Sequence, residues 1–214
     1  MTTMAKIVTT VPILHLLAIG GAFVSFVSSP SLLGGLALIL ATYVLPLLGF
    51  RIHDYFYPTL PGTYDLSGKT YNPWWGSYQF QWAFITFPTF EKLLMAYPPL
   101  YLTWLRLWGA EVGRNVMITP KFEVLDRSLV KIGDNTTFGY SVLITSHYVA
   151  RRDNRPVLVV AKADIGSGCF VGAYTKIAPG AKIHNNIKLP YNSEIWPEEE
   201  VKTNPKPTRK DQHP

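Results

Sequence analysis

The C-terminal half of the chain places an aliphatic residue at every sixth position. The series is Ile165, Val171, Ile177, Ile183, Leu189 and Ile195. An α-helix needs apolar residues three and four positions apart, and a half-buried strand alternates by two, so a period of six fits neither. It fits a short strand and a turn that repeat and stack, because no single repeat can bury its own apolar side chain. The sequence therefore predicts an all-β domain, a parallel β-helix, over residues 109–196.

The same rhythm begins earlier but is interrupted twice. Two runs precede the regular region, and their phases are displaced by two residues around Leu129: Val112, Ile118 and Val124, then Ile132, Phe138 and Ile144. The rhythm also lapses in the segment ARRDNRPVL, residues 150–158. We interpret this segment as a loop that leaves the coil, and a loop on a regular framework often carries function.

Three segments resemble the hexapeptide-repeat acyltransferases: ADIGSGCFVGAYTKIAPGAKI, IGDNTTFGYSVLITSHY and the excursion between them. The resemblance covers residues 109–195, under half of the chain. It implies a left-handed coil, an exception to the right-handed rule for crossovers. It also implies a homotrimer with acyl-CoA as the donor, which the acceptor attacks directly without an acyl-enzyme.

His147, at the end of a coil and just before the excursion, matches the catalytic histidine of that family. Acyl transfer from a thioester needs a base that removes the proton of the attacking hydroxyl or amine, and histidine exchanges protons near neutral pH. The resemblance therefore implies that His147 is the general base, whereas the alternative is a solvated turn histidine. Ser146 lacks the Gly-x-Ser-x-Gly surroundings of a nucleophile. A base usually needs an orienting acceptor, and the sequence leaves four choices: Asp126, Glu123, Asn135 or a backbone carbonyl.

In the family, CoA lies along the crevice between neighbouring subunits. The motif match implies cofactor contacts from Phe170, Gly172 and Ala173, and contacts to the CoA phosphates from Lys176 and Arg152, with Lys182 and Arg151 as alternatives. The other interpretation is that the glycines and Pro179-Gly180 only turn the coil.

No metal site is expected. His184 stands where the family commonly has glycine, but the carbonic anhydrases built on this coil need three histidines, and the repeat region has no third one. Cys169 occupies a small inward position of the repeat, and no cation beside it would stabilise a thiolate.

Residues 1–50 contain two uncharged stretches, residues 7–27 and 32–50, each long enough to cross a bilayer as a helix. They predict a transmembrane helical hairpin. Lys6 and Arg51 favour the cytoplasm for both ends, which would place the β-helix at the cytoplasmic face, where acyl-CoA is made. The alternative is a cleavable signal peptide that ends near residues 27–29. His15 marks a polar pathway or, as we favour, is a ring bonded to the neighbouring helix.

Residues 51–108 are rich in aromatic residues and proline and show neither a helical stripe nor a strand alternation. We interpret them as an interfacial linker, as a cap on the open end of the β-helix, or as both, with a short helix after Pro98-Pro99 that leads to Gly109. Residues 197–214 form a polar basic tail, expected to be disordered. The net charge of +6 beside a membrane anchor favours anionic lipid head groups, and no motif supports a nucleic acid partner.

Together these features predict a multi-pass, homotrimeric membrane protein. It would transfer an acetyl or other small acyl group from acyl-CoA to a hydroxyl or amine of a small-molecule or lipid-linked acceptor. Two alternatives stay open: a non-catalytic β-helix scaffold or trimerisation module, and a peptide-synthetase-like module that transfers an aminoacyl group.

Overall fold

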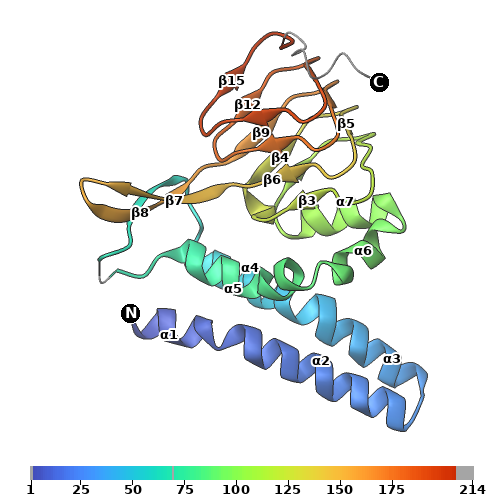
Figure 1. The fold of residues 1–214 in the computed structure, drawn as a ribbon. Coiled ribbons are helices and arrows are strands. Elements are labelled where there is room, and N and C mark those ends of the chain that lie inside the picture. Colours follow the sequence, from blue (N-terminus) through green and yellow to red (C-terminus); the bar gives the residue numbers. More distant parts are fainter. Residues whose placement is uncertain (1, 69, 206–214) are drawn as a thin grey trace. The chain divides into compact units, whose positions relative to one another are not determined.

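A computed structural model describes residues 2–68 and 70–205, and the chain divides into two compact units (Figure 1). The helical unit contains Met1–Leu60 and Gly68–Thr89, and the β-helical unit contains Pro61–Ser67 and Phe90–Pro214. A short piece of the second unit therefore interrupts the first one along the sequence.

The helical unit consists of α1 (Thr3–Thr9), α2 (Val11–Ser28), α3 (Leu32–Ile39), the π-helix η1 (Leu40–Val44), α4 (Leu45–Phe56) and α5 (Pro73–Thr86). Local sequence explains where these helices begin. The Ser31 side chain accepts a hydrogen bond from the Gly34 N–H and starts α3, and the Asn72 side chain accepts from the Trp74 N–H and starts α5. Both are N-cap bonds, which satisfy backbone donors that a helix start leaves without partners.

Two continuous helical stretches, Thr3–Ser28 and Leu32–Phe56, are long and apolar enough to cross a membrane. The second continues past the predicted end at residue 50. Only 17% and 11% of their most apolar windows are buried within the chain, so they are not core helices of this unit. These observations concern length and composition, and the crossing itself remains a prediction.

His15 of α2 bonds to the neighbouring helix, as we favoured from the sequence. Its Nε2 lies 3.2 Å from the carbonyl oxygen of Thr42 in η1, and both residues are buried. Phe84 of α5 lies close to the same place, with its ring centroid 6.0 Å from that of His15 and 6.1 Å from that of Tyr43. Helix α5 therefore packs against the two long helices.

Residues 73–107 form three helices, which the sequence analysis did not predict apart from the last: α5, α6 (Thr89–Met95) and α7 (Pro98–Leu107). Helix α5 shows no polar and apolar faces because its buried residues are of every kind: Trp74, Gly76, Ser77, Gln79, Gln81, Ala83 and Phe84. A helix buried on most sides has no amphipathic stripe to detect.

The β-helical unit is built from short parallel strands. They are β2 (Glu111–Val112), β3 (Glu123–Val124), β4 (Val130–Ile132), β5 (Thr137–Phe138), β6 (Leu143–Ile144), β9 (Ala163–Ile165), β10 (Phe170–Val171), β11 (Lys176–Ile177), β12 (Lys182–Ile183), β13 (Lys188–Leu189), β14 (Glu194–Ile195) and β15 (Glu200–Val201). They form three sheets with the orders β2-β4-β9-β12-β15, β3-β6-β11-β14 and β5-β10-β13. Each strand pairs with the strand on the next coil, so that Ile165 lies beside Ile183 and Val171 beside Leu189. The predicted parallel coil is therefore present, and its six-residue anchors are buried from Val124 onward.

The first interruption of the rhythm is a short 3-10 helix, η2 (Arg127–Leu129), which inserts residues between β3 and β4. The stack also continues to β15, beyond the boundary predicted at residue 196, because Val201 pairs with Ile183. Residues 206–214 of the predicted disordered tail lie outside the described residues.

The second interruption, predicted as a loop that leaves the coil, is a β-hairpin. Strands β7 (His147–Arg152) and β8 (Arg155–Val160) pair antiparallel. The two turn residues, Asp153 and Asn154, both have positive φ angles, 48° and 62°, as a type I′ turn requires. Strand β1 (Gly62–Asp65) adds to the other edge of β8 and completes a three-stranded sheet.

Helix α7 packs against the first coil. Tyr101, Leu105 and Trp108 are fully buried, and the Tyr101 ring meets that of Phe122 edge to face at 6.3 Å between centroids. Gly109 follows with a φ of 103°, which favours glycine, and the chain enters β2. The short helix predicted after Pro98-Pro99 is confirmed, and it covers the core at the start of the coil.

Candidate active site

His147 lies where the chain leaves the second coil to enter β7, and its ring is bonded to Asp126 on the first coil. The Nδ1 atom of His147 is 2.7 Å from Oδ2 of Asp126. The side chain of His147 is 19% exposed and that of Asp126 is 4% exposed. Of the acceptors left open by the sequence, the structure places Asp126 against the ring.

The same carboxylate oxygen accepts a second hydrogen bond, from the backbone N–H of Ser146 at 2.9 Å. Asp126 is the N-cap residue of η2 but its side chain makes no capping bond, so the carboxylate is directed at the next coil instead. The Ser146 hydroxyl donates to the carbonyl oxygen of Leu129 at 2.7 Å. Ser146 therefore serves the packing of the two coils, which agrees with the absence of nucleophile surroundings in the sequence.

This geometry assigns roles to the two ring nitrogens. An ionised carboxylate can only accept hydrogen bonds, so Nδ1 of His147 carries the proton and donates a hydrogen bond to Asp126. The lone pair of the ring is then on Nε2, which is the atom that can take up a proton from a substrate. A histidine held in one tautomer by a buried carboxylate is the arrangement that general-base catalysis needs.

A buried ion pair adjoins this hydrogen bond. Arg127, which follows Asp126 in the chain, donates from Nε to Oε1 of Glu91 at 2.7 Å and from Nη2 to Oε2 at 2.6 Å. The indole N–H of Trp104 donates to the same Oε1 at 2.7 Å. Burial alone would lower the pKa of Arg127, but the Glu91 carboxylate raises it above its ordinary value. Burial raises the pKa of nearby Tyr101 well above its usual range and Glu91 raises it further, so the phenol stays neutral.

The sequence analysis missed the pair of Glu91 and Arg127. One signal was present, because Arg127 falls where the phase of the repeat is displaced, two residues from Leu125 and from Leu129. A charged residue in a core position needs a partner. The partner lies on a different element, α6, and sequence spacing does not identify it.

The predicted cofactor residues lie on several elements. Phe170 on β10 is half exposed, Gly172 is buried, and Ala173 between β10 and β11 is half-buried. Lys176 on β11 is paired with Glu194 at 3.0 Å, and Arg152 is exposed at the end of β7, on the hairpin. Four of the five thus lie on the third coil, while Arg152 belongs to a separate sheet.

Gly172 has a packing reason of its own. A Cβ atom at this position would lie 2.4 Å from the Pro190 carbonyl oxygen and 2.7 Å from the Tyr191 nitrogen. The neighbouring coil therefore excludes any side chain at Gly172, whether or not a cofactor approaches it.

His184, the departure from the family pattern, is bonded to Glu200 on the next coil at 2.6 Å. This bond, with a second one from Lys202, lowers the pKa of Glu200 to about 2. Within residues 2–68 and 70–205, no group of three or more His, Cys, Asp or Glu side chains is arranged to hold a metal ion.

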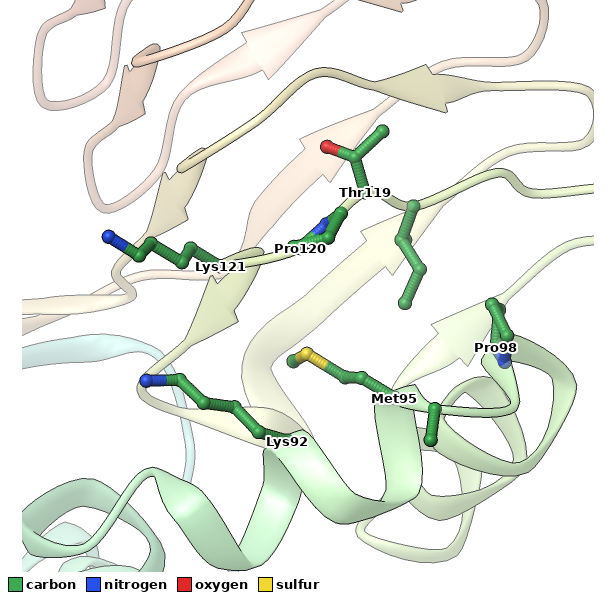
Figure 2. Close-up of a pocket in the computed structure, with 8 residues that line it drawn as sticks. Lys92, Met95, Pro98, Thr119, Pro120 and Lys121 are labelled. Atoms are coloured by element: carbon green, nitrogen blue, oxygen red, sulfur yellow. The ribbon is translucent and has the colours of Figure 1, made fainter.

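A groove with a volume of about 560 Å³ lies between α6, the start of α7 and the first coil (Figure 2). Its lining residues are Lys92, Met95, Ala96, Pro98, Ile118, Thr119, Pro120 and Lys121. Figure 2 shows the Met95 side chain in the space between helix and coil, and the two lysines extending toward the same side. Such a lining suits an apolar group that ends in an anion. None of the predicted cofactor residues lines it.

Comparisons with known proteins support the repeat assignment. No family model matches the chain. It is 31% identical over 81 residues to the bifunctional protein GlmU of Synechococcus sp. (strain RCC307), which is 38% of this chain and 18% of that protein. It is 32% identical over 85 residues to YvoF of Bacillus subtilis (strain 168), whose assignment as an acetyltransferase is inferred. The matched segment is 39% of this chain and 46% of that protein. The chain thus spans less than half the length of these relatives.

Two solved structures are similar at low identity. One is the hexapeptide-repeat acetyltransferase VCA0836 of Vibrio cholerae O1 biovar eltor with acetyl-CoA, at a TM-score of 0.40 and 18% identity over 44% of this chain and 52% of that one. The other is serine acetyltransferase isoform 3 of Entamoeba histolytica with cysteine, at a TM-score of 0.38 and 13% identity over 83% and 74%. At such scores neither likeness bears on the activity of this chain.

The six-residue rhythm, the three parallel sheets that it builds, and the relatives found by sequence point in one direction. Over its repeat region this chain is similar to the hexapeptide-repeat acyltransferases.

Proposed function

We propose that this protein transfers an acetyl or another small acyl group from acyl-CoA to a hydroxyl or amine of an acceptor, with His147 as the general base. The observation that carries the proposal is the 2.7 Å bond between His147 Nδ1 and the buried Asp126 carboxylate. Burying a carboxylate is costly unless it is paired. A scaffold has no need for such a group at the point where the chain leaves the coil, and a general base does.

In this mechanism Asp126 holds the ring so that Nε2 of His147 faces the acceptor. Nε2 takes the proton as the acceptor oxygen or nitrogen bonds to the thioester carbonyl carbon, and the carbon–sulfur bond then breaks. The proton passes from His147 to the departing CoA sulfur, so CoA leaves as a thiol and the base is restored. The negative charge of Asp126 stabilises the imidazolium that forms between the two steps.

For the donor we propose a site along the third coil. The half-exposed Phe170 ring and the short Ala173 side chain leave an accessible apolar strip beside the buried Gly172. Lys176 and Arg152, both exposed, would meet the CoA phosphates. As the family resemblance implies, a second copy of this chain would form the other wall of the crevice, in a left-handed homotrimer.

We further propose that Thr3–Ser28 and Leu32–Phe56 anchor the enzyme as a transmembrane hairpin, with both ends and the β-helix on the cytoplasmic side. Support comes from the length of the two helices and from the apolar side chains they expose. Lys6 and Arg51 near the two outer ends agree with this orientation.

The test uses the purified, detergent-solubilised full chain with acetyl-CoA and pooled hydroxyl and amine acceptors. We expect acceptor-dependent release of CoA that His147→Ala abolishes. His184→Ala is the matched control, because His184 also contacts a carboxylate across neighbouring coils, and it should retain the activity. Release that survives His147→Ala would refute the role of the base. No release with any acceptor, combined with no thermal stabilisation by CoA, would favour a scaffold.

A further inference from the structure

Arg127 is the most deeply buried charged side chain near the candidate base, at 1% exposed. It is also the immediate chain neighbour of Asp126. Two of its guanidinium nitrogens bond the Glu91 carboxylate in the parallel, two-point geometry that fixes orientation as well as distance. A point charge such as lysine cannot reproduce that geometry.

The ion-pair partner of Arg127 and the aromatic rings around the pair come from outside the coil. Glu91 lies on α6 and Trp104 on α7, and Trp104 fixes the Glu91 carboxylate through its indole N–H. The guanidinium carbon also lies 5.9 Å from the centre of the Trp108 ring, just after α7. The two helices that precede the first coil therefore converge on one residue of η2.

The segment that carries Asp126 is held from both sides. On the helix side, Arg127 is tied to Glu91 and also donates from Nη1 to the Leu125 carbonyl oxygen at 3.4 Å. On the coil side, the Leu129 carbonyl accepts from the Ser146 hydroxyl. Within the segment, the Leu129 N–H donates to the Asp126 carbonyl at 2.9 Å. A shift of Arg127 would thus displace the backbone of Asp126 relative to His147.

We propose that Glu91, Arg127 and Trp104 are positioning residues, through which α6 and α7 hold the Asp126 carboxylate at Nδ1 of His147. The inference rests on the proposed function for its catalytic meaning but not for its structural content. It gives the helices before the coil a role in the chemistry, in addition to covering the core.

The experiment measures the state of the His147 ring directly. Full-length protein labelled with ¹⁵N-histidine reports, from the imidazole nitrogen shifts, which ring nitrogen carries the proton. The signal of His147 among the five histidines is assigned with His147→Gln. The variants are Glu91→Gln, Arg127→Lys and Trp104→Phe. Leu189→Ala is the control, because it removes a buried side chain from a later coil and lowers stability without touching the network.

In the wild type we expect the proton on Nδ1, facing Asp126. In Glu91→Gln and Arg127→Lys the ring should become a mixture of tautomers, and kcat should fall about 10- to 100-fold, as for a misplacement of about 1 Å, while the KM for acyl-CoA stays within about twofold. Trp104→Phe keeps the ion pair and should fold, with a smaller change in the same direction. Leu189→Ala should lower Tm and leave the tautomer unchanged.

An unchanged His147 tautomer in the folded variants would overturn the inference, and so would an equal change in Leu189→Ala. If Glu91→Gln and Arg127→Lys do not fold, Trp104→Phe decides, and an unchanged ring signal in it counts against the proposal. A wild type without transferase activity would refute the proposed function alone, because the ring signal still tests the positioning.

Discussion

Replacing Asp126 by asparagine separates the charge of the carboxylate from its geometry. The hydrogen bonds from Ser146 N and from His147 Nδ1 end on the same oxygen of Asp126. The amide oxygen of asparagine can take that place, because the Ser146 N–H repels the amide NH₂ group and selects the oxygen. The ring therefore keeps its tautomer and orientation, and only the negative charge is lost.

The size of the effect follows from that charge. A hydrogen bond to an ionised group contributes about 1.5–3 kcal/mol, against about 0.5–1.5 kcal/mol for a neutral one. The attraction between a carboxylate and an imidazolium about 4 Å apart is about 4 kcal/mol at an effective dielectric constant near 20. The loss of transition-state stabilisation then lies at about 1.5–4 kcal/mol, which corresponds to about a tenfold to thousandfold fall in kcat.

The assay is acceptor-dependent CoA release, with Tm measured on the same preparations. For Asp126→Asn we expect this fall in kcat, an unchanged KM for acyl-CoA because the side chain is only 4% exposed, and a Tm close to that of the wild type. Asp126→Ala is the comparison. It leaves the Ser146 N–H without this acceptor and should lower the free energy of unfolding by about 1–3 kcal/mol. If Asp126→Asn keeps the wild-type kcat, the carboxylate does not assist the base and the reasoning fails.

Two further predictions concern the later coils. Gly172→Ala should destabilise the protein by about 1–3 kcal/mol, because the added methyl group meets the backbone of Pro190. Gly20→Ala is the control and should not lower Tm, because its methyl group meets nothing within 4 Å. Equal Tm values for the two variants would contradict this prediction. The pKa of Glu200, lowered to about 2 by His184 and Lys202, means that the pairing stabilises the fold fully above the ordinary value of 4.5 and is lost as the pH falls toward 2. An NMR titration should show the pKa of Glu200 rising toward 4.5 in His184→Gln, and an unchanged pKa would show that His184 is not its cause.

The coil was predictable because its period is written directly in the sequence. The anchors of the regular region are buried, so the positions of Ile165, Val171 and Ile177 specify which residues stack. The displacement by two residues around Leu129 likewise marks η2. The hairpin also left a sign that the sequence analysis did not use, the Asp-Asn pair at its turn.

The sequence could not predict where a side chain points or which residues of distant elements contact each other. Helix α5 was missed because it is buried on most sides and shows no stripe. Asp126, Glu123 and Asn135 are all near His147 along the coils, and only the turn of the backbone at η2 decides which carboxylate or amide reaches the ring. The contact of Glu91 with Arg127 joins α6 to η2, and no periodic pattern relates those two elements.

The two interruptions of the rhythm are also the two places from which the candidate site is built. The regular coils bury apolar anchors and small side chains such as Cys169 and Thr175, and the buried carboxylate of the site stands where the repeat breaks. Val124 pairs with Ile144, and two residues further along each coil Asp126 and Ser146 therefore lie one above the other. At the first of these positions the chain turns into η2, and at the second it leaves for the hairpin with His147. Because the two breaks stack directly, the Asp126 carboxylate at the first break reaches the His147 imidazole at the second. A change in the length of the coil between these points would move the two side chains apart.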